Sequence, residues 1–173
     1  MFSIVIACGL ASCARDEPAA VREGSARLVL KPLVISQAAE WRRRTAYVPV
    51  YSSIHWGFDR KLVDLSITVT LRNTSTERDL AVHSVRYYDS TGKLIRSFVD
   101  TPSSLSPMTT ADFVIQQRDT TGGVGASFRI ETGSSGEADD ALIEAVMIGQ
   151  NGNAGVSFTS QAKDLEPQVK QAK

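Results

Sequence analysis

Between residues 63 and 72 the chain alternates strictly between apolar and polar side chains, and this pattern constrains the fold more than any other feature. The residues between the apolar positions are aspartate, serine, two threonines and arginine. Because successive side chains of a β-strand point to opposite faces, the segment predicts a strand with one buried and one wet face. The apolar positions are Val63, Leu65, Ile67, Val69 and Leu71.

Further segments with strand character follow at a spacing of roughly ten residues. Residues 80–88 and 93–99 flank the turn sequence DSTG, whose Gly92 is free to adopt a positive φ, so the pair predicts a β-hairpin. We count about seven to nine short strands and no convincing helical period. The sequence therefore predicts an all-β fold, an immunoglobulin-like antiparallel β-sandwich. The other predicted strands span residues 110–117, 124–131, 142–148 and 156–158.

The beginning of the chain resembles a bacterial lipoprotein signal peptide. A short apolar run at residues 2–7 leads to Leu10-Ala11-Ser12-Cys13, in which small residues precede a cysteine. Cleavage before Cys13 would leave it at the new N-terminus, with lipid attached to its sulfur. Cys8 and Cys13 are the two cysteines of the chain, so no disulfide is expected in the folded domain. The alternative is a buried N-terminal strand, or an apolar segment without a special role.

A lipid on Cys13 would determine where the protein is located. One acyl chain holds a protein only marginally, at about 0.8 kcal/mol for each buried CH₂ group, but lipoproteins that match this pattern usually carry three chains. The residue after Cys13 is Ala14 and not aspartate. By resemblance to lipoproteins of Gram-negative bacteria, we expect attachment to the outer membrane, facing the periplasm. No run of about eighteen apolar residues predicts a transmembrane helix.

The composition divides the chain into four parts. Residues 1–12 form the predicted signal peptide, and residues 13–44 the lipidated cysteine with a flexible tether. Residues 45–163 form the predicted β-sandwich domain, and residues 164–173 a polar tail. Trp41-Arg42-Arg43-Arg44 is interpreted as a solvated linker whose tryptophan covers an edge of the core. Contact of these residues with anionic lipid headgroups is the alternative.

The charge balance narrows the possible partners. The chain has 19 Lys and Arg against 19 Asp and Glu, so its formal net charge is zero. A general nucleic-acid binder would have a basic surplus, so nucleic acid is not an expected partner. Two histidines provide little for a histidine-based metal site, and we expect neither a metal nor another cofactor.

Residues 47–56 provide the best candidate for a binding surface. Pro49 cannot donate a hydrogen bond to a neighbouring strand, which favours an edge strand. In a continuous strand, Tyr47, Tyr51 and His55 share one face and form an exposed aromatic stripe. Aromatic side chains are enriched at recognition surfaces because they bury a large area at low entropic cost. We expect this stripe to contact another envelope protein or a glycan, and the alternative is an ordinary or covered surface.

Two loops allow both a chemical and a structural interpretation. Gly122-Gly123-Val124-Gly125 resembles a phosphate loop, but no Gly-Lys-Ser/Thr follows and the next segment is a predicted strand, which favours a hairpin or a bulge. The acidic residues Glu137, Asp139 and Asp140 lack the ligand spacing of a calcium loop. A solvated loop is the favoured interpretation of that segment.

Glu144 interrupts the apolar run at residues 142–148, which is typical of a central strand. A buried carboxylate is costly unless it is paired or hydrogen-bonded. We therefore expect a structural ion pair with Arg86, Arg96 or Arg129, or a position at a sheet edge, rather than a ligand site.

His55 and His83 are the candidate general bases for catalysis. Hydrolysis requires a nucleophile and an orienting carboxylate within reach of the histidine. Neither histidine is accompanied by a recognisable nucleophile motif. We therefore expect that the protein is not an enzyme.

Six short motifs follow one another in a recognisable order. They are YVPVYS from Tyr47, LRNT from Leu71, VRYYD from Val85, GKL from Gly92, DTTGG from Asp119 and EAVMIG from Glu144. From about residue 47 to residue 158, the chain resembles the bacterial family catalogued as domain of unknown function three-one-two-four. Members of this family are often predicted lipoproteins, which agrees with the interpretation of Cys13. The resemblance implies no activity and no catalytic residue.

The sequence thus predicts a membrane-anchored envelope lipoprotein that acts as a non-catalytic binding or interaction module. A small periplasmic hydrolase or ligand sensor that uses His55 or His83 is the alternative.

Overall fold

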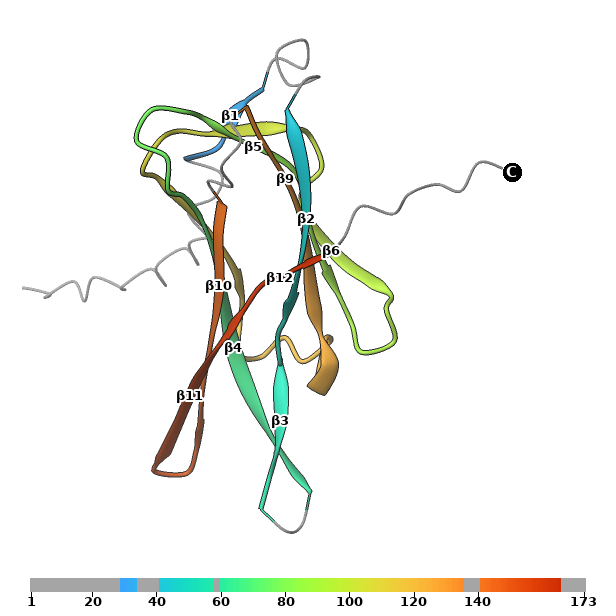
Figure 1. Ribbon diagram of the computed structural model, residues 1–173. Helices are drawn as coiled ribbons and strands as arrows, with labels where there is room; N and C mark the ends of the chain where they lie inside the picture. Colours follow the sequence, from blue (N-terminus) through green and yellow to red (C-terminus); the bar gives the residue numbers. More distant parts are fainter. Residues whose placement is uncertain (1–28, 34–40, 58–59, 136–140, 166–173) are drawn as a thin grey trace, which may run out of the picture.

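The computed structural model describes residues 29–33, 41–57, 60–135 and 141–165, which form two antiparallel β-sheets packed face to face (Figure 1). The first sheet has seven strands in the order β1-β7-β5-β9-β2-β12, with β6 beside β5. The second has five strands in the order β11-β10-β4-β3, with β8 beside β4. The predicted all-β sandwich is confirmed.

The strands of each sheet have the following bounds. The first sheet contains β1 (Lys31–Pro32), β2 (Arg42–Pro49), β5 (Leu80–Tyr88), β6 (Leu94–Val99), β7 (Ser103–Leu105), β9 (Ser127–Ser134) and β12 (Lys163–Leu165). The second sheet contains β3 (Ser53–Trp56), β4 (Lys61–Asn73), β8 (Thr110–Ile115), β10 (Ala141–Asn151) and β11 (Ala154–Gln161). Nine of these twelve strands in the described residues have four or more residues, which agrees with the predicted seven to nine.

The core lies between the sheets and is lined by one face of each. On β4 the five apolar side chains of the alternating segment are 0–4% exposed, and burying each contributes roughly 1.5–3 kcal/mol. Four aromatic rings add to the core. Phe128 lies against Tyr87 and Phe98, with ring centroids 5.0 and 5.7 Å apart, and Phe98 meets Phe113 at 5.6 Å. These rings join β5, β6 and β9 of the first sheet to β8 of the second.

β5 and β6 form the predicted hairpin. Gly92 has a φ of +83°, as the turn requires. Asp89 Oδ1 accepts hydrogen bonds from the amides of Thr91 and Lys93 at 2.8 and 2.9 Å. The Thr91 hydroxyl and these amides hold the pKa of Asp89 below its ordinary value.

The folded domain is longer than predicted at both ends. β2 begins at Arg42, within the predicted tether of residues 13–44, and β12 extends two residues past the predicted end at 163. Arg44 forms an ion pair with Asp164 of β12 and donates to the carbonyl oxygen of Ala141 in β10 at 2.7 Å. Arg42 and Arg43 are exposed, as predicted, but the interpretation of the segment as a linker is wrong. Three successive polar residues lack the alternation that would indicate a strand.

Two short strands complete the first sheet. β1 contains Lys31 and Pro32, lies within the predicted tether and pairs with β7. The sequence of β7 is Ser-Ser-Leu, and Ser104 donates to Asp79 Oδ2 at 2.6 Å. The two serines of β7 give this strand no apolar period, so the sequence does not predict it.

Part of the predicted organisation concerns residues that the structure does not describe. Cys13 and the predicted signal peptide lie outside the described residues, as do Glu137, Asp139, Asp140 and the end of the tail after residue 165. Among the described residues, no helix is long and apolar enough to cross a membrane. No group of three or more His, Cys, Asp or Glu side chains within these ranges is arranged to hold a metal ion.

Candidate functional site

The predicted aromatic stripe is divided between the two sheets. Tyr47 lies in β2 of the first sheet, between β9 and β12, whereas His55 lies in β3 of the second. Between them the chain crosses from one sheet to the other, and the amides of Val50 and Ser52 donate to carbonyl oxygens just before β9, at 2.9 and 3.1 Å. The prediction of a single edge strand is therefore wrong, because the period of two continues through a crossing that the sequence does not mark.

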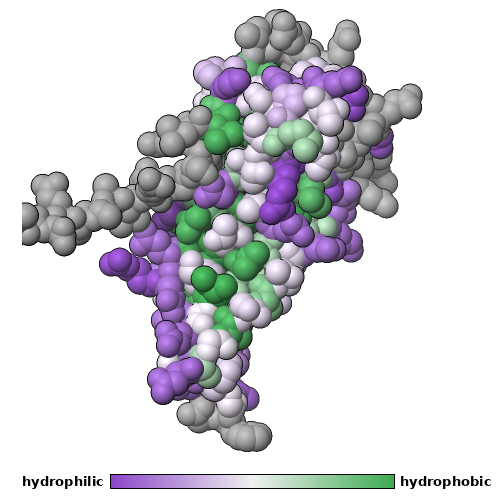
Figure 2. Space-filling view, turned by 90° about the vertical axis from the view of Figure 1, so that its left-hand side faces the viewer, coloured by the Kyte–Doolittle hydropathy of each residue, from purple (hydrophilic) through white to green (hydrophobic). Residues whose placement is uncertain are grey.

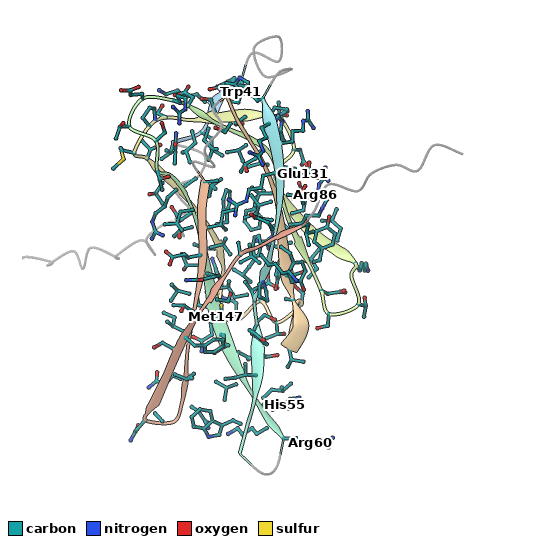
Figure 3. The ribbon with its side chains drawn as sticks, in the orientation of Figure 1. Trp41, His55, Arg60, Arg86, Glu131 and Met147 are labelled. Carbon is teal, nitrogen blue, oxygen red and sulfur yellow. The ribbon has the colours of Figure 1, made fainter. Side chains whose placement is uncertain are left out.

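The three residues of the stripe have different surroundings. Tyr51 is half-buried and packs edge-on against Phe158 of β11, with ring centroids 5.6 Å apart. His55 is exposed, and its Nδ1 lies 3.4 Å from the carbonyl oxygen of Arg60 (Figure 3). Tyr47 is 39% exposed on the outer face of the first sheet. Tyr47 is therefore the member of the stripe that lies on the first sheet, away from the second-sheet contacts of Tyr51 and His55.

Tyr47 belongs to a row of side chains that crosses four neighbouring strands. Lys163 of β12 lies opposite Tyr47, Tyr47 lies opposite Arg129 of β9, and Arg129 lies opposite Arg86 of β5. Opposed residues in antiparallel strands point to the same face, so all four side chains project from the outer face. Neighbouring strands are about 4.8 Å apart, so the row spans about 14 Å. We call these four residues the cationic row.

The charges of the cationic row are unbalanced. Nη1 of Arg129 forms an ion pair with Oε1 of Glu131, at 2.8 Å. Arg86 forms no ion pair with any residue in the described part of the chain. Figure 3 shows Arg86 and Glu131 beside β2 and β9, on the side away from β10. Among the described residues, the three cations of the row therefore have one ion-pair partner, Glu131.

Arg86 and Arg129 face each other directly across β5 and β9. Like charges in this position destabilise a sheet, by about 0.2–1 kcal/mol. A carboxylate or phosphate group between them would replace the repulsion by charge-assisted hydrogen bonds, because a guanidinium group binds such anions as a planar fork. The exposed ring of Tyr47 provides an apolar surface beside these charges. The cationic row is therefore suited to an anionic ligand that also has an apolar face.

His83 lies at a break in the register of β5, near Glu131. Its side chain is 8% exposed, and burial lowers its pKa, with a further lowering by Arg43 that Glu131 opposes. The neutral imidazole is therefore favoured. Neither Nε2 of His83 nor Oγ of Ser84 has a hydrogen-bond partner among the described residues, so these two do not form a nucleophile–base pair. His55 lies in the other sheet, and the structure does not bring the two histidines together.

Glu144 forms the expected ion pair, but its partner is none of the three arginines predicted. Its carboxylate contacts Arg72 of β4 on the outer face of the second sheet, and the two side chains are 38% and 39% exposed. The expected partners Arg86, Arg96 and Arg129 belong to the first sheet. The expectation of a buried carboxylate is wrong because the outer face of β10 is open to solvent.

The glycine-rich segment at residues 122–125 leads from β8 into β9 and contains a 3₁₀ turn, η1 (Gly123–Gly125). A Cβ at Gly122 would lie 1.9 Å from Oη of Tyr87. The amide of Gly125 donates to Oγ of Ser90 at 3.0 Å. Close packing on β5 and its hairpin therefore explains the glycines, and neither a phosphate loop nor a hairpin is formed.

Arg86, Arg129 and Lys163 are members of a site that the sequence does not predict. Arg129 occupies a polar position of the alternating segment 124–131, so its outward direction could have been inferred, whereas residues 80–88 around Arg86 do not alternate. Their opposition depends on the register of β5 with β9, which no local pattern specifies.

The protein is therefore an antiparallel β-sandwich, and the outer face of its first sheet carries the cationic row. The chain belongs to the family described as Protein of unknown function (DUF3124), whose model matches residues 43–165, from β2 to β12. The predicted resemblance is thereby confirmed. No curated protein matches the chain. A solved structure described as "Crystal Structure of Thermotoga maritima 1070" is similar, with a TM-score of 0.42 and 11% identity over 69% of this chain and 92% of that one.

Proposed function

We propose that this protein is a non-catalytic binding module of the bacterial envelope that holds an acidic glycan on its cationic row. The observation that carries the proposal is the direct opposition of Arg86 and Arg129, with a single ion pair, from Arg129 to Glu131, formed by the row within the described residues. A sheet that acts only as a scaffold gains stability from an uncharged residue at position 86. Destabilising features of this kind are typical of functional sites.

The position of the row favours a glycan over an acidic protein segment. An extended peptide usually binds by adding a strand at a sheet edge, where its backbone finds hydrogen-bond partners. The cationic row lies across the face of four strands, where no such partners are available. The ring of Tyr47 lies between Lys163 and Arg129, so a sugar ring can stack on it while its acidic group contacts a neighbouring cation.

The proposed location rests on the sequence before the domain. Leu10-Ala11-Ser12-Cys13 supports lipidation of Cys13, and Ala14 supports the outer membrane, facing the periplasm. An anchor of several acyl chains would hold the module at the membrane surface. A module in this place would encounter envelope polysaccharides.

Titration of the full chain with three probes tests the proposed ligand. We expect polygalacturonate to bind, neutral dextran not to bind, and the affinity for polygalacturonate to fall as salt screens the exposed charges. Poly-glutamate distinguishes the two classes of partner, because Tyr47→Ala should weaken polygalacturonate more than poly-glutamate. His55→Ala, which removes an exposed ring from the other sheet, is the control. Absence of polygalacturonate binding would contradict the proposal, and shortening of its chains would contradict a non-catalytic role.

Metabolic labelling tests the anchor. We expect radiolabelled palmitate to enter the wild-type chain and the Cys8→Ser variant, but not the Cys13→Ser variant. A wild-type chain without label, or a label that persists in Cys13→Ser, would contradict lipidation at this residue.

A further inference from the structure

β11 is an edge strand of unusual composition. It pairs with β10 on one side, in a register that continues without interruption over all eight of its residues. Its sequence, AGVSFTSQ, contains neither a charged residue nor a proline. Free edges normally carry charges, prolines or bulges, or remain very short, because an unprotected edge pairs with other strands.

The other edge strands in the described part of the chain are protected. β1 and β12 have two and three residues, and β3 has four. β6 has interruptions in its register with β5, and Arg96 in this strand forms an ion pair with Asp119. β8 carries the charge of Asp112. The long and uncharged edge of β11 is therefore an exception among the described edge strands.

The turn before β11 determines which of its backbone groups are free. Gly152 and Asn153 connect β10 to β11, and Gly152 has a φ of +61°, as expected for a two-residue hairpin turn. In such a hairpin the closing pair, here Asn151 and Ala154, is hydrogen-bonded, and the direction of the bonds then alternates along the strand. The amide and carbonyl groups of Gly155, Ser157, Thr159 and Gln161 therefore point away from β10.

We propose that β11 pairs with β11 of a second copy of this chain, antiparallel, around a two-fold axis at Ser157. A two-fold axis brings an edge against itself, so any charge near the axis would meet a like charge, and β11 has none. In this register Gly155 of one copy lies opposite Thr159 of the other, with their free backbone groups facing. Val156 of each copy would lie opposite Phe158 of the other copy. Both side chains are half-buried in a single copy.

The outer face of the second sheet is compatible with this pairing. Exposed apolar side chains of β10, among them Val146 and Ile148, lie next to β11. Figure 2, which views this side of the molecule, shows hydrophobic side chains down its middle and hydrophilic ones at its margins. Pairing at β11 would join the five strands of each copy into one sheet and make this surface continuous. The zero net charge of the chain means that two copies do not repel each other at long range.

Disulfide trapping tests the axis directly. The full chain is prepared with Cys8→Ser and Cys13→Ser, and single cysteines are introduced by Ser157→Cys or Thr159→Cys. At the axis, the two copies of residue 157 are about 5.5 Å apart between Cα atoms, within the range of a disulfide. The two copies of residue 159 are displaced by about 14 Å along the strands. We expect Ser157→Cys to form dimers and Thr159→Cys to form them only when mixed with Gly155→Cys.

Equal trapping of Ser157→Cys and Thr159→Cys, or trapping of neither, would overturn the proposal. Sedimentation of the chain without introduced cysteines gives an independent readout. Ser157→Lys should weaken the dimer by about tenfold or more, because the two lysines meet at the axis. Gln150→Lys, which adds the same charge to the outer face of β10, should leave it unchanged. A wild-type chain that sediments as a monomer at all accessible concentrations would also reject the pairing.

Discussion

Both sheets are antiparallel, but their outer faces carry different side chains. On the first sheet, Arg86 and Arg129 oppose each other beside the exposed ring of Tyr47. On the second, Arg72 is paired with Glu144, and the neighbouring outward side chains are mainly apolar or hydroxyl-bearing. Leu142, Val146 and Ile148 are 40–53% exposed there. All three of these apolar side chains belong to β10.

This contrast distinguishes a charge that is balanced by a neighbouring opposite charge from a charge that faces a like charge. The inward side chains of both sheets are constrained by the shared core, whereas the outward ones are free to vary. An arginine with an opposite charge beside it, such as Arg72, needs no further explanation. Arg86 has a like charge opposite and no ion pair within the described residues, and the proposed ligand rests on this difference from Arg72.

The largest expected effect comes from the core that both faces share. Phe128 is fully buried and contacts two other rings. Phe128→Ala should lower the free energy of unfolding by about 3–5 kcal/mol, because the substitution leaves a cavity. Chemical denaturation measures this loss, and Phe128→Leu should cost clearly less. A loss below about 1 kcal/mol for Phe128→Ala would mean that the core relaxes around the cavity.

A smaller effect is expected from a glycine beneath the outer face of the first sheet. A Cβ at Gly133 would lie 2.9 Å from Nε2 of the buried His83. Gly133→Ala should therefore destabilise the domain by about 1–3 kcal/mol. Gly125→Ala in η1 is the matched control, because its Cβ would lie 3.4 Å from the nearest atoms, those of Ser90, which is an ordinary contact distance. Thermal unfolding measures the stability of both variants. Equal stabilities would show that the His83 side chain shifts to accommodate the Cβ without loss of stability.

The pH dependence of stability tests the buried state of His83. Burial and Arg43 lower its pKa from the ordinary value of 6.5. The unfolded chain therefore binds a proton at His83 more readily than the folded chain does. Stability associated with His83 should be complete above about pH 6.5 and decrease as the pH falls toward the lower pKa of the folded state. The decrease should be about 1.4 kcal/mol for each pH unit that separates the pKa of the unfolded chain from that of the folded chain.

The pH profile of His83→Gln, measured by denaturation, isolates this contribution from that of the carboxylates. The difference between the wild-type and variant profiles should appear below about pH 6.5. Parallel profiles across this range would contradict a lowered pKa.

The smallest expected effect has opposite signs on the two faces. Arg86→Gln should raise the free energy of unfolding by about 0.2–1 kcal/mol, because it removes the like charge opposite Arg129. Arg72→Gln should lower it by about 0–1 kcal/mol, because it removes an exposed ion pair. Denaturation of the two variants side by side provides the comparison. A loss of stability in Arg86→Gln would indicate that Arg86 supports the fold.

The sequence was sufficient to predict local structure but not what neighbouring strands bring together. The alternation on β4 and the turn around Gly92 depend on near neighbours, and both are confirmed. The prediction of a continuous aromatic stripe was wrong because the chain passes from one sheet to the other between Tyr47 and His55. The alternation of side chains continues through this crossing and does not reveal it. The partner of Glu144 and the opposition of Arg86 to Arg129 depend on register between strands distant in sequence.

The most direct test of the cationic row is the affinity of the full chain for polygalacturonate after the same charge is removed from either face. Arg86→Gln should weaken binding by about tenfold or more, as expected for loss of a charge-assisted hydrogen bond. Arg72→Gln changes the net charge equally and should leave the affinity within about twofold, because exposed charges on the far face are screened. Equal affinities of the two variants would contradict a ligand held by Arg86.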